Sequence, residues 1–166
     1  MSLRQDIAAW DGKSAEAIGN VYLRHCNDPA FVRKTLDCVA NPSLEVGATW
    51  LLKRHAEAGG AIDGQALYRL APRLGHWEAK LHVLQCLPHT PVPATQRRAT
   101  EKFLRGGMAD DAKFVRAWAY SGFHALACQY PAYRDEADAL LRAALDAEPP
   151  SVTARVRKAL IAGFTG

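Results

Sequence analysis

The segment that most constrains the fold of this chain is one that occurs twice. Residues 115–123 read Val-Arg-Ala-Trp-Ala-Tyr-Ser-Gly-Phe, and residues 156–164 read Val-Arg-Lys-Ala-Leu-Ile-Ala-Gly-Phe. Val, Arg, Gly and Phe match in place, and most other positions keep a small or apolar residue. Self-similarity at a long spacing is typical of repeat proteins, in which each unit buries its apolar side against its neighbours. The repetition therefore predicts an architecture and leaves function open.

The rest of the chain reads as a series of helices. Ala and Leu, which lose little entropy on entering a helix, are abundant, and β-branched residues are sparse. Apolar residues recur at helical spacing between clusters of Gly, Pro, Asn and Asp, and no segment predicts a strand. The expected helices cover residues 3–9, 14–25, 29–39, 44–58, 63–74, 77–87, 94–105, 111–129, 134–147 and 151–163. The short loops make sequential helices antiparallel, so we expect an all-α fold built from helical hairpins.

Two signals set the expected helix ends. Asp28 and Pro29 are expected to start a helix, the first as its cap and the second in the first helical position, where a missing N–H is tolerated. Gly-Gly pairs at residues 59–60 and 106–107 are expected to end the helices that precede them.

Four of the expected helices align with one another, and each is preceded by a helix that keeps the same spacing. The first shared position holds Leu44, Ala79, Val115 and Val156, the next, four residues on, holds Ala48, Val83, Ala119 and Leu160, and the third, eight residues on, holds Leu52, Leu87, Phe123 and Phe164. The preceding helices align at Leu36, Leu70, Leu104 and Leu141. A period of roughly 35–40 residues with two helices per unit indicates an α-solenoid.

On these residues the chain resembles the HEAT-repeat family, in the wider armadillo-type superfamily. In that family the second helix of a unit opens with an acidic residue, then a Val-Arg pair, then small residues. Residues 111–119, Asp-Ala-Lys-Phe-Val-Arg-Ala-Trp-Ala, match this pattern. Residues 156–157 match it with Ser151 in place of the acid, and residues 79–80 are a weaker version. The resemblance implies a right-handed solenoid of four to five hairpins over about residues 29–164.

The resemblance also implies how the chain is divided. Residues 1–166 would form a single HEAT-like repeat domain. An N-terminal capping hairpin would cover residues 3–26, and the repeats would cover about 29–58, 63–87, 94–129 and 134–164.

A structural role is implied for the arginine of the Val-Arg pair. In HEAT units this arginine commonly pairs with an acid in its own or the adjacent repeat, and a guanidinium fork is well suited to such pairing. The repeat ladder would then consist of Asp111, Arg116 and Arg157, rather than these residues binding an acidic ligand. Glu45 occupies the same position with the opposite charge, so we expect the ladder to be broken at that unit.

Second helices line the concave side of such a solenoid, which is the natural place for a ligand. The candidate binding residues are tryptophans and polar side chains at outward positions of these helices: Trp50, Glu78, His82, Gln85, Trp118 and Ser121. Tryptophan supplies a large contact area at low entropic cost, which suits a peptide-binding groove. The alternative is that the tryptophans pack between adjacent repeats.

The charge distribution favours a protein partner over nucleic acid. The net charge is +4, and the excess lies in residues 61–130, which carry nine Lys/Arg and five Asp/Glu. This is a mild bias and not the footprint of a dedicated nucleic-acid binder. Arg98, Lys102 and Arg105 form a basic line on a first helix, which we interpret as a solvated outer face.

The cysteines and the chain start indicate a cytoplasmic protein. Four cysteines lie in apolar helical segments without a CxxC pair, so we expect reduced core thiols and neither a metal site nor a cofactor. The first residues lack the pattern of a signal peptide, and no apolar run approaches the roughly 18 residues that span a membrane.

No motif points to catalysis, since a Gly-rich phosphate loop, a nucleophile elbow and an HExxH pair are all missing from the sequence. We therefore predict a non-catalytic interaction module that binds a protein or peptide on its concave face. The alternative is a DNA-binding protein similar to the HEAT-like alkylpurine DNA glycosylases, which Trp77, Trp118, Lys80 and the central positive charge suggest. No catalytic residue of those enzymes can be matched here, and a small-molecule or tetrapyrrole lyase-like helper rests on fold analogy alone.

Overall fold

The computed structural model describes residues 1–164, and within them all regular secondary structure is helical. The predicted all-α class is therefore confirmed. The helices of the described residues are α1 (Leu3–Ala9), α2 (Ala15–His25), α3 (Phe31–Val39), α4 (Glu45–Glu57), α5 (Gly64–Leu70), α6 (Trp77–Cys86), α7 (Arg97–Met108), α8 (Lys113–Gln129), α9 (Arg134–Ala147) and α10 (Pro150–Ala162). Single 3-10 turns occur at Ala71–Arg73, Leu87–His89, Ala94–Gln96 and Pro131–Tyr133.

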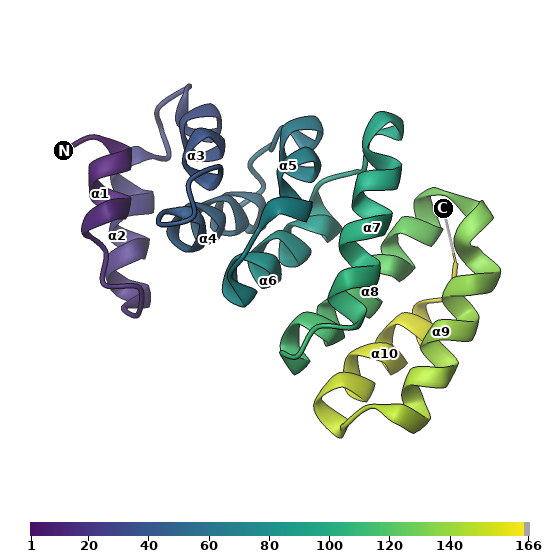
Figure 1. The fold of residues 1–166 in the computed structure, drawn as a ribbon. Helices are drawn as coiled ribbons and strands as arrows, with labels where there is room; N and C mark the ends of the chain where they lie inside the picture. Colours follow the sequence, from purple (N-terminus) through teal and green to yellow (C-terminus); the bar gives the residue numbers. More distant parts are fainter. Residues whose placement is uncertain (165–166) are drawn as a thin grey trace.

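The even-numbered helices pack in one continuous series. Helix α2 packs on α4, α4 on α6, α6 on α8, and α8 on α10. The odd-numbered helices α1, α3, α5 and α7 contact one another in the same order. Figure 1 shows the helix pairs following one another from the purple N-terminal end to the green and yellow helices α9 and α10. Each inner pair is therefore held mainly by the pairs before and after it in the sequence.

The positions that repeat in the sequence form the core of this arrangement. The first repeated position is buried in all four helices, and the other two are buried in the first three of them. In the last unit, Leu160 of α10 and Phe164, just after the helix, are partly exposed. The larger apolar cluster runs from α1 into α9, and a smaller one joins α8, α9 and α10 through Ala117, Leu141, Ala144, Val152, Val156 and Ala159.

Side-chain caps begin several helices where the sequence predicted them. Ser14 accepts a hydrogen bond from the Ala17 amide at the start of α2, and Asp63 accepts one from the Ala66 amide at the start of α5. Each cap satisfies an amide that has no partner inside the helix.

The expected start of α3 at Pro29 was wrong. The helix begins at Phe31, with Ala30 as its N-cap residue. The Asp28 carboxylate accepts a hydrogen bond from the Ala30 amide at 2.8 Å and forms an ion pair with the Lys34 ammonium at 2.7 Å. Asp28 therefore closes a local turn before the helix instead of capping it.

The expected end of α7 at the glycine pair was also wrong, because α7 continues to Met108. A Cβ atom on Gly107 would lie 2.8 Å from the Cβ atom of Ala119, and one on Gly106 would meet nothing within 4 Å. Gly122 of α8 is equally tight, since its Cβ atom would lie 2.6 Å from a methyl group of Leu104. Gly107 and Gly122 therefore let α7 and α8 approach closely, and Gly107 does not terminate the helix.

Candidate functional site

Three predicted site residues lie at the same position of three neighbouring helices. Trp50 of α4, Gln85 of α6 and Ser121 of α8 align in the repeat, and all three are partly exposed. Because α4 packs on α6 and α6 on α8, these side chains follow one another across the helix series. We call them the even-helix strip. Trp50 also has the Lys53 ammonium 5.8 Å from its ring centroid, so the strip begins with an aromatic ring beside a cation.

His82, which the sequence placed with these residues, makes a contact between helices. Its Nδ1 atom lies 3.0 Å from the Thr49 hydroxyl of α4. Burial, together with the nearby Lys53 ammonium, lowers the pKa of His82 to about 4. The imidazole is therefore neutral at pH 7 and joins α4 to α6.

Trp118 packs between helix pairs. The guanidinium carbon of Arg155 lies 3.6 Å from the centroid of its ring, which joins α8 to α10. Burial lowers the pKa of Arg155, and the face of an indole ring attracts a cation. Trp118 therefore matches the packing alternative for the tryptophans, and it keeps only part of its surface for solvent.

Arg116 holds the start of α8 to the turn before α10. Its Nε atom donates to both carboxylate oxygens of Glu148, at 3.0 and 3.1 Å. One terminal nitrogen also donates to the main-chain carbonyls of residues 110–111, at 3.0 Å each. Arg157, at the same position of α10, is exposed and donates to the Thr153 hydroxyl of its own helix at 3.4 Å.

The two earlier even helices, α4 and α6, also make a contact at this position. Lys80 of α6 pairs with Asp110, in the turn before α8, at 3.1 Å. Glu45 of α4 accepts hydrogen bonds from the Gly75 amide at 2.9 Å, and from the amide and Nδ1 of His76 at 2.7 Å each. The charge at this position is reversed at Glu45, and the partner changes with it from a side chain of opposite charge to two amides and a histidine ring. An anion at this position binds the amides that begin the next even helix.

These three contacts differ from the predicted repeat ladder of Asp111, Arg116 and Arg157, of which only Arg116 takes part, and we call them the observed ladder. It consists of Glu45 with residues 75–76, Lys80 with Asp110, and Arg116 with Glu148. In each of them, the residue after the first repeated apolar position of one even helix reaches the segment that precedes the next even helix. The observed ladder therefore fixes the starts of α6, α8 and α10 against the preceding even helix.

Glu78 lies apart from the even-helix strip, in a hollow of about 620 Å³. The hollow lies between the start of α6, the end of α7 and the turn before α8. We call it the Trp77 hollow, and its lining is Gly75, His76, Trp77, Glu78, Lys80, Gly106, Ala109, Asp110, Asp111 and Ala112. Trp77 is 44% exposed. The sequence analysis considered Trp77 only for DNA binding and Asp111 only for the repeat ladder. The one feature of the sequence that indicates the hollow is an aromatic residue at a helix start, outside the repeated apolar positions.

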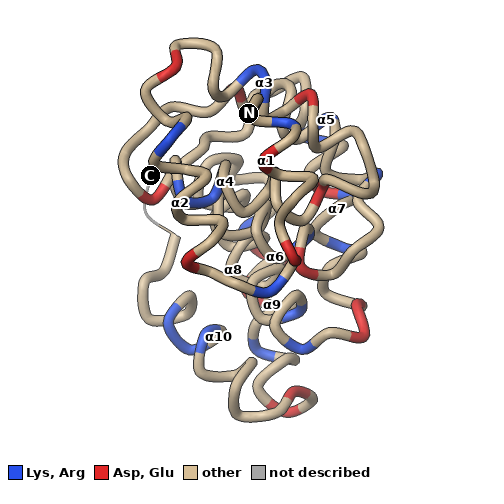
Figure 2. The backbone as a smooth tube through the Cα atoms, turned by 90° about the vertical axis from the view of Figure 1, so that its left-hand side faces the viewer, with Lys and Arg blue, Asp and Glu red and all other residues tan. Residues whose placement is uncertain are grey.

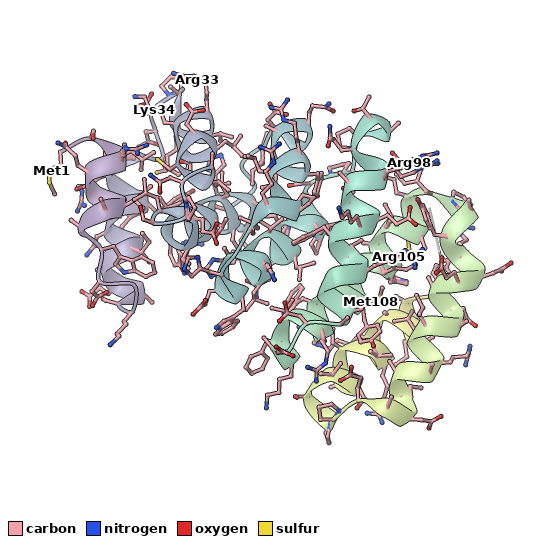
Figure 3. All side chains as sticks on the ribbon, in the orientation of Figure 1. Met1, Arg33, Lys34, Arg98, Arg105 and Met108 are labelled. Carbon is pink, nitrogen blue, oxygen red and sulfur yellow. The ribbon has the colours of Figure 1, made fainter. Side chains whose placement is uncertain are left out.

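One member of the basic line on α7, Arg105, is neutralised by neighbours. Arg105 is paired with Glu101 at 2.9 Å and with Glu136 at 2.6 Å. Figure 3 shows Arg98 and Arg105 extending from α7, and Arg98 and Lys102 are exposed. In Figure 2, Lys and Arg positions are interspersed with Asp and Glu positions along the tube. Acidic positions are therefore mixed with basic ones over the chain, and within residues 1–164 Arg105 is the one member of the basic line that forms an ion pair.

The cysteines divide into two classes. Cys38 and Cys86 are buried, and burial raises the pKa of both thiols, that of Cys86 to about 12. Cys26 and Cys128 are only partly buried, so the expectation of four core thiols holds for two of them. All four are free. Among the described residues, no group of three or more His, Cys, Asp or Glu side chains is placed to hold a metal ion.

Comparison with known proteins adds no relative. The chain matches no protein-family model, and neither the curated proteins nor the solved structures give a match. Within residues 1–164, no helix is both long enough and apolar enough to cross a membrane. The geometry of the chain itself therefore carries the functional argument.

Proposed function

We propose that this chain is a right-handed α-solenoid of four to five HEAT-like hairpins that acts as a non-catalytic interaction module. In this proposal a protein or peptide partner binds along the even-numbered helices. The observation that carries it is the even-helix strip, in which Trp50, Gln85 and Ser121 are partly exposed at one position of three neighbouring helices.

The spacing of packed helices suits an extended peptide. Neighbouring helices lie roughly 8–10 Å apart, and a peptide in the extended polyproline II conformation rises about 3.1 Å per residue with three residues per turn. Every third side chain of such a peptide lies on the same side, about 9 Å from the previous one, and would therefore meet successive members of the strip. Trp50 supplies a large apolar surface, and Gln85 and Ser121 supply hydrogen bonds that fix the register of the peptide. His82 and Trp118 support the strip from within, because their contacts with Thr49 and Arg155 hold the neighbouring helices together.

The proposal is tested by using the chain as bait for its binding partners. Proteins that co-purify with it are identified by mass spectrometry, and the binding of each purified candidate is then measured by calorimetry. The double variant Gln85→Arg/Ser121→Arg places two bulky cations on the strip and is expected to abolish specific binding. The matched control is Ala139→Arg/Ala143→Arg, which adds the same charge at exposed positions of α9.

The result depends on the difference between the two variants. Loss of binding in the strip variant, with binding retained in the control, supports the proposal. Partners that bind the strip variant as tightly as the wild type would remove the strip from the interface.

A further inference from the structure

The Trp77 hollow combines an exposed aromatic face with negative charge. Trp77 and Glu78 are the first two residues of α6, and Asp111 lies in the turn before α8. The remaining wall includes Gly75, Gly106 and Ala109, whose small side chains leave the volume of about 620 Å³ open. The hollow is therefore accessible and large enough for a long side chain with part of its main chain.

The charges that line the hollow do not cancel. Its lining contains three carboxylates and one lysine. Lys80 is paired with Asp110, and the His76 ring is bound to Glu45, which lies outside the hollow. Within residues 1–164, the carboxylates of Glu78 and Asp111 have neither a hydrogen bond nor an ion pair. Two carboxylates therefore remain available in the hollow that Trp77 lines.

An aromatic face with carboxylates beside it is the arrangement that recognises an organic cation. The ring quadrupole attracts a guanidinium or ammonium group, and carboxylates accept its hydrogen bonds. We propose that the Trp77 hollow binds a lysine or arginine side chain presented by a basic segment of a partner protein. The size of the hollow favours a side chain on a peptide over a bare metal ion, which would require convergent oxygen ligands at short range.

Because the net charge of the chain is positive, a cationic partner is expected to bind at the hollow and not over the whole surface. At +4, the chain as a whole repels a cationic partner, so attraction must come from a local concentration of negative charge. The inference goes beyond the proposed function, because it concerns a surface that shares no residue with the even-helix strip. The two can therefore fail separately.

The inference is tested by fluorescence anisotropy with two labelled synthetic peptides. One alternates Arg and Lys with Gly and Ser, and the other replaces each cation by Glu. The basic peptide is expected to bind the wild type, and the acidic peptide is not. Trp77→Ala and the double variant Glu78→Gln/Asp111→Asn should each weaken binding of the basic peptide by about tenfold or more, and Trp77→Phe should restore part of the affinity.

A charge-matched control separates the hollow from general electrostatics. Glu16→Gln/Asp135→Asn removes two exposed carboxylates from the first turns of α2 and α9 and should leave the affinity unchanged. Circular dichroism melts establish that each variant is folded. Equal weakening in the control, or full affinity in a folded Trp77→Ala variant, would overturn the proposal. Spermidine that binds as tightly as the peptide would overturn the assignment to a protein segment.

Discussion

The Nε atom of Arg116 lies 3.0 and 3.1 Å from the two carboxylate oxygens of Glu148, and this contact joins the start of α8 to the turn before α10. The side chains are 21% and 11% exposed, so solvent screens the pair less than it screens a surface salt bridge. The same place is taken by Lys80 and Asp110 one unit earlier. The contact between neighbouring even helices is therefore a recurring feature of the fold.

Substitution of Arg116 by methionine should lower the free energy of unfolding by about 2 kcal/mol, because it leaves the Glu148 carboxylate partly buried without its cation. Urea denaturation followed by circular dichroism measures the change. The matched control is Arg142→Met, which breaks the exposed pair of Arg142 with Asp138 and should cost no more than about 0.5 kcal/mol. Equal losses in the two variants would contradict a structural role for the Arg116 contact.

Glu45→Ala should be more damaging than Glu45→Gln. The buried Glu45 carboxylate accepts two amide hydrogen bonds at the start of α6, and alanine leaves both amides without this partner. We expect a loss of about 2–4 kcal/mol for alanine and about half as much for glutamine, whose carbonyl can still accept a hydrogen bond. Chemical denaturation of both variants checks the order. A glutamine variant that is less stable than the alanine variant would show that the amide contacts contribute little.

His82 should make the stability depend on pH. In the unfolded chain a histidine titrates near pH 6.5, whereas burial lowers the pKa of folded His82 to about 4. Between these values the unfolded chain binds a proton that the folded chain does not bind. The stabilisation is therefore complete above pH 6.5 and is lost as the pH falls toward 4, by at most about 3 kcal/mol.

The measurement for His82 compares unfolding free energies of the wild type and His82→Gln between pH 7 and pH 4. Other acid-sensitive groups are shared by both proteins, so the difference between the curves isolates His82. We expect the wild-type curve to fall more steeply. Parallel curves across this range would rule out a neutral, half-buried imidazole as the cause of the pH dependence.

The neighbouring glycines of α7 should respond in opposite directions to alanine. Gly107→Ala places a methyl group 2.8 Å from Ala119 and should cost about 1–3 kcal/mol, because neither backbone can move away freely. Gly106→Ala meets nothing within 4 Å and should gain about 0.5–1 kcal/mol from the helix preference of alanine. Thermal melts of the two variants provide the comparison. Stabilisation by Gly107→Ala would mean that α7 and α8 are not closely packed at this point.

The helices and their buried sides were predictable because both depend on local periodicity. Leu44, Ala79, Val115 and Val156 are all buried, as their apolar spacing predicted. The exceptions involve information from elsewhere in the chain. Gly107 was predicted to end a helix, whereas a glycine is needed there because Ala119 of the next helix packs against it. The role of Glu45 could not be predicted, because the amides that it binds, at residues 75–76, lie far from it in the sequence.

The candidate site was predicted less well than the fold. An outward position on one helix predicts exposure only if no neighbour covers it, and Thr49 and Arg155 cover His82 and Trp118 from other helices. The Trp77 hollow is formed by three segments, so no single stretch of sequence contains its pattern. Periodicity alone therefore finds the strip and misses the hollow.

The reversed charge at Glu45 means that the helix pairs are not interchangeable parts. Excision of α7 and α8 would bring Lys80 opposite Glu148, and a cation would again meet an anion. Excision of α5 and α6 would bring Glu45 opposite Asp110, and two carboxylates would face each other where a buried anion needs a donor. Removal of one helix pair would therefore keep the charges complementary when α7 and α8 are removed, and would place like charges together when α5 and α6 are removed. Duplication or exchange of helix pairs is limited in the same way by the charge at each junction.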